Sequence, residues 1–166
     1  MSDAHLQVPH QLTANVKLLH KVAIRVGDEV LILKRSAKAK SRPGKWDLPG
    51  GNSEWPHDLA DNMLNPHQRD VAREIEEETS LIVPADTFTK ENLVYFATYY
   101  EAEKKIFSVN LGWQVTELTA EAKENVKISF EHQDSAWITL EQLSDYDFGG
   151  PERDYETKII RQVLSK

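Results

Sequence analysis

The residues on either side of Gly27-Asp28 constrain the fold of this chain more than any other segment. Before them, residues 16–26 are predicted to form a strand, because Val22, Ile24 and Val26 occupy every second position near its end. After them, residues 29–35 contain the apolar run Val30–Leu33. Gly-Asp between two strand patterns is a hairpin signal, and an unbroken apolar run predicts burial on both faces. The sequence therefore predicts a hairpin whose second strand is fully buried.

Strand and helix patterns interleave along the rest of the chain. Asn65-Pro66 predicts a helix start, with Asn65 as N-cap and Pro66 at the first helical position. The other predicted elements are an extended piece at 45–48, a hairpin of strands at 93–100 and 105–116, a strand at 135–138, a brief helix from Thr139 and a final helix after Pro151. This order predicts an α/β (α+β) protein with helices packed on a mixed sheet.

Composition excludes several classes of protein. The 166 residues are enough for one domain, predicted over 16–166 after a flexible arm at 1–15. The net charge of −7 disfavours a nucleic-acid polymer as partner. There is no cysteine, which excludes disulfides, thiolate metal sites and a cysteine nucleophile. We find no signal-peptide pattern and no apolar stretch that could span a membrane, so we expect a cytoplasmic protein without a membrane partner.

The most unusual segment is Arg73–Glu78, which places four carboxylates in six positions. On a helix, Glu74, Glu77 and Glu78 share one face, where like charges repel each other by roughly 0.2–0.5 kcal/mol per pair. A hard divalent cation held by oxygen ligands relieves that repulsion. The alternative is an acidic surface that is merely solvated, as charged helix faces usually are.

Three other features accompany this helix. Pro49-Gly50-Gly51 predicts a tight backbone turn that can approach a ligand or ion closely. Residues 34–45 contain six cationic side chains and no acid, which makes a local positive region in an acidic protein. Farther along, Glu131-His132 precedes Trp137 by a few residues.

Together these residues resemble the Nudix hydrolase family, whose box reads Gly-x5-Glu-x7-Arg-Glu-U-x-Glu-Glu-x-Gly-U with U an aliphatic residue. Gly51 matches the first glycine, and residues 73–81 match the second half of the box. The approach at 44–51 and the Glu131-His132 pair before Trp137 are also typical. The resemblance covers roughly residues 16–145, and it implies an α/β/α sandwich with a mixed sheet.

The chain departs from the family box at three places. Arg73 lies 22 positions after Gly51, whereas the box has 14, so about eight residues are inserted. The middle glutamate of the box falls on Asn65 counted back from Arg73, or on His57 counted forward from Gly51. Ser80 replaces the final glycine, and a left-handed serine costs about 1–2 kcal/mol.

The resemblance implies a metal-dependent hydrolase that cleaves the diphosphate linkage of a nucleoside diphosphate linked to X. It implies Mg²⁺ or Mn²⁺ held by Glu74, Glu77, Glu78 and the Gly51 carbonyl oxygen. Arg73 lies one turn before Glu77, so it can hold that carboxylate. Glu131 is the candidate for a further ligand or for the general base, which makes Arg73, Glu77 and Glu131 the predicted catalytic residues.

The substrate side is less constrained. We assign Arg35, Arg42, Lys45 and Trp46 as substrate contacts, although the charged loop can equally be solvated and Trp46 can equally pack within the protein. The inserted segment at 52–65 can set specificity, form a homodimer contact or decorate the surface. A catalytically silent nucleotide-binding domain of the same family is the alternative function. Isopentenyl diphosphate isomerase is excluded, because that enzyme needs a cysteine.

Overall fold

The computed structural model describes residues 15–54, 62–150 and 154–166. Residues 1–14 of the predicted arm and residues 55–61 of the inserted segment at 52–65 therefore lie outside the described residues. The strands form a mixed six-stranded sheet with the order β3-β2-β1-β5-β4, and β6 pairs with β2. The strands are β1 (Val16–Val26), β2 (Glu29–Arg35), β3 (Trp46–Asp47), β4 (Leu93–Glu101), β5 (Ile106–Val115) and β6 (His132–Ile138).

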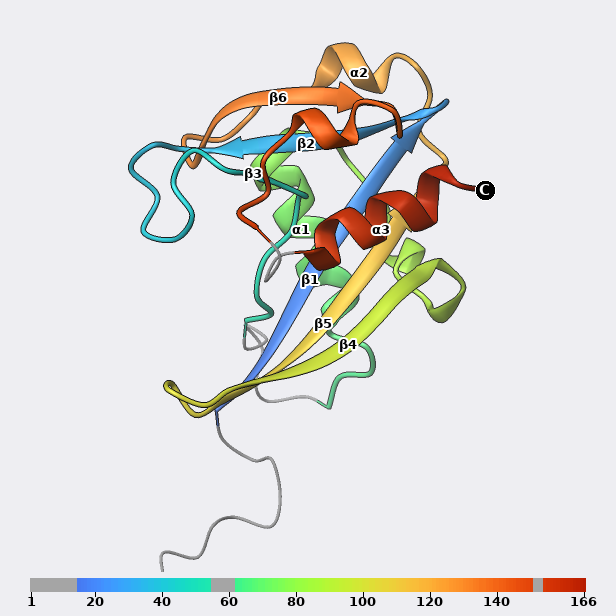
Figure 1. Cartoon of the computed structure of the whole chain (residues 1–166). Coiled ribbons are helices and arrows are strands. Elements are labelled where there is room, and N and C mark those ends of the chain that lie inside the picture. The colour runs from blue at the N-terminus through green and yellow to red at the C-terminus, as the bar shows by residue number, and fades with distance from the viewer. Residues whose placement is uncertain (1–14, 55–61, 151–153) are drawn as a thin grey trace, which may run out of the picture.

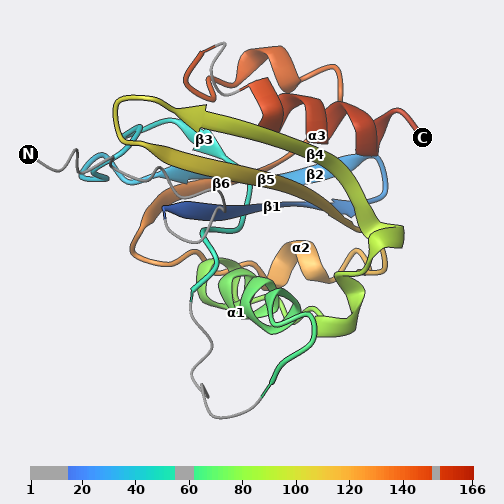
Figure 2. The same cartoon turned by 90° about the horizontal axis from the view of Figure 1, so that it is seen from below.

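Helices cover both faces of this sheet. Figure 2 shows α1 (His67–Thr79) and α2 (Ala122–Asn125) on one face and α3 (Asp154–Leu164) on the other. Short 3₁₀ helices at Ala85–Thr87, Lys90–Asn92 and Leu143–Asp145 lie in the connections. This layering confirms the predicted α/β/α sandwich. Within the described ranges, none of the helices has the length and apolar character needed to cross a membrane.

The core has two parts, one on each face of the sheet. Val30 and Ile32 of β2 face α3, whereas Leu31 and Leu33 face α1. All four side chains are completely buried. The prediction that the apolar run of β2 is buried on both faces is therefore confirmed.

The strand β1 organises the region that concerns function. One edge pairs with β5 in parallel along most of its length, from Val16 opposite Phe107 to Ile24 opposite Val115. The other edge pairs with β2 only near the hairpin. The earlier part of that second edge instead receives the segment after β3 (Figure 1). The glycine turn thus lies against a central strand and close to α1.

Several boundaries differ from the predictions. The helix α1 begins at His67 with Pro66 as its N-cap, and no side chain caps it. The predicted N-cap Asn65 was wrong, because Asn65 adopts a left-handed backbone with φ of 52°. The strand β6 begins at His132, three residues before the predicted start, and α2 had no sequence signal. Thr139 leads into a 3₁₀ turn, in which its N–H donates to Oε1 of Gln142.

Candidate functional site

The glycine turn is held tightly against β1. The N–H groups of His20 and Val22 donate to the carbonyl oxygens of Gly51 and Pro49, each at 2.9 Å. Gly50 has a φ of 123°, and a Cβ at this position would lie 2.3 Å from the His20 carbonyl oxygen. Only glycine fits such a backbone position. The predicted close approach is present, and the group approached is the backbone of β1.

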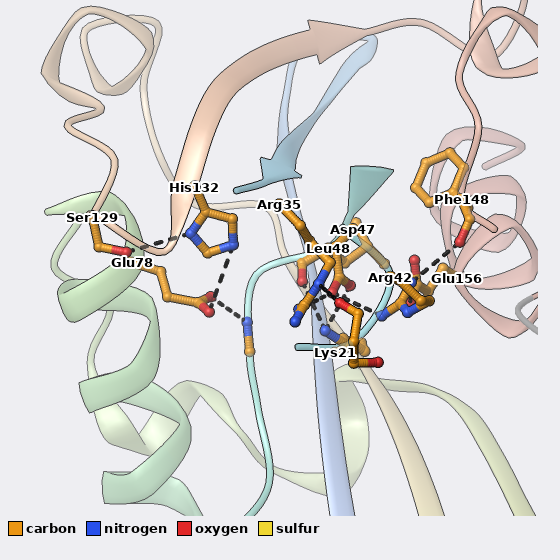
Figure 3. A network of polar contacts seen from close by, with 12 residues as sticks. Lys21, Arg35, Arg42, Asp47, Leu48, Glu78, Ser129, His132, Phe148 and Glu156 are labelled. Carbon is orange, nitrogen blue, oxygen red and sulfur yellow. Dashed lines mark hydrogen bonds and ion pairs between the residues drawn. The ribbon is translucent and has the colours of Figure 1, made fainter. Parts of the chain in front are cut away.

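Glu78 is the buried carboxylate of the site. Its residue is 9% exposed, and Oε2 accepts a hydrogen bond from the Gly50 N–H at 2.8 Å (Figure 3). Burial raises the pKa of Glu78 to about 8, although nearby Lys21 opposes this effect. A buried carboxylate with a strongly raised pKa, next to a turn that admits no side chain, is typical of a functional site.

Glu74 lies on the other side of the same turn. A Cβ added to Gly51 would be 3.1 Å from Oε2 of Glu74, so this carboxylate is in contact with the turn. Burial also raises the pKa of Glu74. The third glutamate of the predicted face, Glu77, has a side chain that is 57% exposed. The helix therefore presents two carboxylates to the turn and a third to solvent.

Arg73 neutralises the outer part of this acidic face. The predicted pair with Glu77 is present at 2.8 Å, and Arg73 also binds Glu74 at 2.9 Å. Its shortest contact, at 2.6 Å, is with Asp70, which we did not single out from the sequence. The signal was available, because Asp70 stands three positions before Arg73 on the same helix. These contacts, led by the hydrogen bond to Asp70, raise the pKa of Arg73.

The loop before β6 packs against the C-terminal end of α1, next to Glu78. Lys127 and Ser129 donate backbone hydrogen bonds to Thr79 and Glu78 at the end of α1. His132, which is buried, has Nε2 3.9 Å from Oε1 of Glu78. Burial lowers the pKa of His132 to about 4, so the ring is neutral at physiological pH. Glu131 is exposed, and its carbonyl oxygen accepts a hydrogen bond from the Ser36 N–H at 2.8 Å.

The donor set suits a hard divalent cation. Carboxylate and carbonyl oxygens are the ligands that Mg²⁺ and Mn²⁺ prefer, and Glu74, Glu78 and Gly51 bring such oxygens to one turn. Across residues 15–54, 62–150 and 154–166, no three acidic or histidine side chains lie close enough together to coordinate one ion. Arg73 instead binds the exposed oxygens of the outer carboxylates.

The four predicted substrate residues have partners within the protein. Arg35 and Arg42 both bind Asp47, at 3.2 Å and 3.0 Å. Lys45 pairs with Asp147, and the Trp46 ring packs edge-on against Tyr146 with centroids 5.0 Å apart. Trp46 therefore packs against another residue of the protein, as the alternative interpretation predicted. We leave all four residues out of the proposed substrate site.

A buried network of charges lies next to the site, between β1, β3 and α3. Lys21 binds Asp47 at 2.6 Å, and Arg42 joins Asp47 to Glu156 of α3, whose residue is completely buried (Figure 3). Burial alone would raise the pKa of Asp47, but Lys21 and Arg42 outweigh it and lower that pKa to about 2. Burial raises the pKa of Glu156. This network fixes the chain that leads into the glycine turn.

An open cleft of about 610 Å³ lies on the α3 face of the sheet, where β1, β5 and β4 run side by side. Its floor includes Leu19, Ser108 and Asn110, and Tyr155 of α3 also lines it. Ser108 Oγ and Asn110 Oδ1 are buried and have no hydrogen-bond partner among the described residues. Leu19 pairs with Asn52, the residue after Gly51, so the cleft borders the glycine turn.

Solved structures resemble this chain over nearly its whole length. The MutT protein of Methanosarcina mazei has 23% identity and a TM-score of 0.62, with 92% of this chain and 99% of that chain covered. The Nudix domain of Shewanella oneidensis NrtR, solved with ADP ribose, has 18% identity and a TM-score of 0.64, with 99% and 98% covered. A Caenorhabditis elegans Ap4A hydrolase has 20% identity and a TM-score of 0.56, with 90% and 96% covered.

No protein-family model and no curated protein matches the chain. The similarity therefore lies in the three-dimensional arrangement, together with the turn and acidic helix described above. The TM-scores and the coverage of both chains show that the overall fold agrees with that of these neighbours. The chain has the fold of the Nudix hydrolases.

Proposed function

We propose that this protein is a metal-dependent hydrolase that cleaves the diphosphate linkage of a nucleoside diphosphate linked to X. The proposal rests chiefly on the environment of Glu78. Its carboxylate is buried and accepts a hydrogen bond from the Gly50 N–H, beside the two glycines of the turn. Burying an ionisable group without a full set of partners is costly. Such a carboxylate is retained where it has a ligand to bind, and Glu74 beside the same turn supplies a second oxygen donor.

In the proposed site, Mg²⁺ or Mn²⁺ is held by Glu74, Glu77 and Glu78 with the Gly51 carbonyl oxygen. A bound divalent ion neutralises phosphate oxygens and lowers the pKa of bound water. Phosphoryl transfer depends chiefly on positioning and charge neutralisation, so the chain has to orient the substrate rather than react with it. Arg73 orients Glu77, to which it is bonded at 2.8 Å.

Glu131 is the proposed general base. Its residue is exposed and directly precedes His132, which lies beside Glu78. A general base has to reach the water that attacks phosphorus, directly or through one further water. His132 is buried and neutral. In this scheme it packs beside Glu78 and accepts no proton.

The nucleoside part of the substrate is proposed to occupy the cleft on the α3 face. Ser108 Oγ can donate a hydrogen bond and Asn110 Oδ1 can accept one, and neither has a partner within the part of the chain that the structure describes. A planar base with both donor and acceptor groups satisfies them. The cleft borders the glycine turn through Leu19 and Asn52, which suits a ligand whose phosphates extend towards the acidic helix.

The test is a kinetic screen with Mg²⁺ or Mn²⁺ across nucleoside triphosphates, ADP-ribose, dinucleoside polyphosphates and nucleotide sugars, with detection of released phosphate groups. We expect one class to be hydrolysed, and we expect Glu77→Gln and Glu78→Gln to lower the rate by about a hundredfold or more while the protein stays folded. Glu76→Gln is the matched control, because Glu76 is exposed on the same helix.

Two outcomes contradict the proposal. If Glu77→Gln and Glu78→Gln both keep more than a tenth of the wild-type rate, these carboxylates are not the metal ligands. If nucleotides bind but none is cleaved with either metal, the protein is the catalytically silent binding domain instead.

A further inference from the structure

His20 of β1 contacts three separate parts of the candidate site. Its backbone N–H donates to the Gly51 carbonyl oxygen at 2.9 Å. Its ring nitrogen Nε2 lies 2.7 Å from Oγ of Ser53, just past the turn. Its ring also stacks on that of His67, the first residue of α1, with centroids 6.0 Å apart. One residue that is 2% exposed thus joins the turn through its backbone, and the segment after the turn and the acidic helix through its ring.

The hydrogen bonds of the His20 ring fix its tautomer. Trp113 of β5 donates its Nε1–H to Nδ1 of His20 at 3.0 Å, so Nδ1 is the acceptor. The ring proton is therefore on Nε2 and is donated to Ser53 Oγ. Burial lowers the pKa of His20 to about 4, which keeps the ring neutral. Both ring nitrogens are in use, so the ring has one orientation, set by Trp113.

The residues beside His20 hold the same turn from the other face. Lys21, whose side chain points to the α3 face, donates to the Leu48 carbonyl oxygen at 3.2 Å. Ser53 in turn donates its N–H to the Leu18 carbonyl oxygen at 2.8 Å. The segment from Leu48 to Ser53 is therefore fixed along one edge of β1, and His20 lies at its centre.

We propose that His20 is a positioning residue for the metal-binding turn. Its backbone and ring set where the Gly51 carbonyl oxygen lies relative to Glu74 and Glu78. The role in metal binding rests on the proposed function, whereas the fixing of the turn does not. Residues that orient metal ligands typically change metal affinity by about 10–100-fold when they are replaced.

The test compares His20→Leu, which removes both ring hydrogen bonds, with His20→Gln, which keeps a donor and an acceptor. Trp113→Phe removes the bond that orients the ring and also alters the packing of this side chain on His67 and Phe88. Ile24→Ala is the matched control, because Ile24 is fully buried in the same strand but does not contact the turn. Two quantities are measured: hydrogen exchange of the Gly50 and Ser53 amides in EDTA, and the dissociation constant of Mn²⁺ by electron paramagnetic resonance.

We expect His20→Leu to accelerate exchange of both amides about tenfold beyond the control at equal global stability, and to weaken Mn²⁺ binding by about 10–100-fold. Trp113→Phe is expected to act in the same direction to a smaller extent, and His20→Gln is expected to recover most of both losses. If His20→Leu does not fold, Trp113→Phe decides the question.

The inference is overturned if the His20 and Trp113 variants match the control within twofold in both measurements. A wild-type protein that binds no Mn²⁺ and cleaves no nucleotide contradicts the proposed function and the role of His20 in metal binding. In that case, faster exchange at Gly50 and Ser53 in the His20→Leu variant still supports the fixing of the turn, so the two failures are distinguishable.

Discussion

Replacing Glu78 with glutamine is expected to stabilise the metal-free protein at neutral pH. Burial raises the pKa of this carboxyl group from 4.5 to about 8. The pKa of such a carboxyl group is higher in the folded than in the unfolded chain. Below about pH 4.5 the group is protonated in both states and leaves the free energy of unfolding unchanged. It lowers stability progressively as the pH rises from there to about 8. Glutamine cannot ionise, and its amide oxygen can still accept the Gly50 N–H.

The size of this effect follows from the pKa. One pKa unit corresponds to about 1.4 kcal/mol. At pH 7, about 2.5 units above the ordinary value, Glu78 is ionised in the unfolded chain but mostly protonated in the folded one, and this difference lowers the free energy of unfolding by about 3 kcal/mol. At pH 8.5 the reduction reaches about 5 kcal/mol. A domain of this size has a total stability of about 5–15 kcal/mol, so the difference is easily measured.

The assay is urea unfolding in EDTA at pH 5, 7 and 8.5, for wild type, Glu78→Gln and the control Glu76→Gln. The gain from Glu78→Gln should be small at pH 5 and should grow with pH, whereas Glu76→Gln should change little. Added Mg²⁺ should then stabilise the wild type but not Glu78→Gln, because binding to the folded state alone adds stability. A Glu78→Gln protein that is no more stable than wild type at pH 8.5 refutes the reasoning.

Two further substitutions test other parts of the structure. Ser80 ends α1 with a φ of 61°, so Ser80→Gly should raise the free energy of unfolding by about 0.5–1 kcal/mol. A lower melting temperature for Ser80→Gly contradicts this reading of the helix end. Asp47→Asn leaves Lys21 and Arg42 buried with one fewer carboxylate, and should cost about 3–5 kcal/mol in urea unfolding. The control Asp147→Asn removes an exposed pair and should cost at most about 1 kcal/mol. Equal losses for both aspartates mean that the buried network contributes no more than a surface pair.

Local patterns predicted the parts of the structure that depend on neighbouring residues. The strands at 16–26 and 29–35 have the predicted bounds, because alternation and the Gly27-Asp28 turn act within a few positions. The contact of Arg73 with Glu77 follows from helical spacing alone. Ser80 is left-handed, which is the case for which the sequence predicted a cost, because the family has glycine at this position.

Features that join distant parts of the chain were not predictable in this way. Arg42 was assigned to the substrate because six cations cluster in its loop, but its partners Asp47 and Glu156 come from β3 and α3. Helical spacing places Glu156 on the same stripe of α3 as Ile159 and Ile160, but it does not indicate which cations Glu156 meets there. The N-cap at Asn65 failed for a related reason, since the inserted segment enters α1 through a left-handed residue. The ring contacts of His20 likewise depend on Trp113, far along the sequence.

The parallel pairing of β1 with β5 has a consequence for the order in which the protein folds. The residues of the glycine turn and the acidic helix are synthesised before β5, yet the turn is held by β1, whose other edge stays unpaired until β5 emerges. Pairings between segments so far apart form slowly, because a long loop has to close first. A nascent chain that ends before Ile106 therefore lacks the strand that pairs with β1 along most of its length, and the proposed cation site is complete only after β5 has been synthesised.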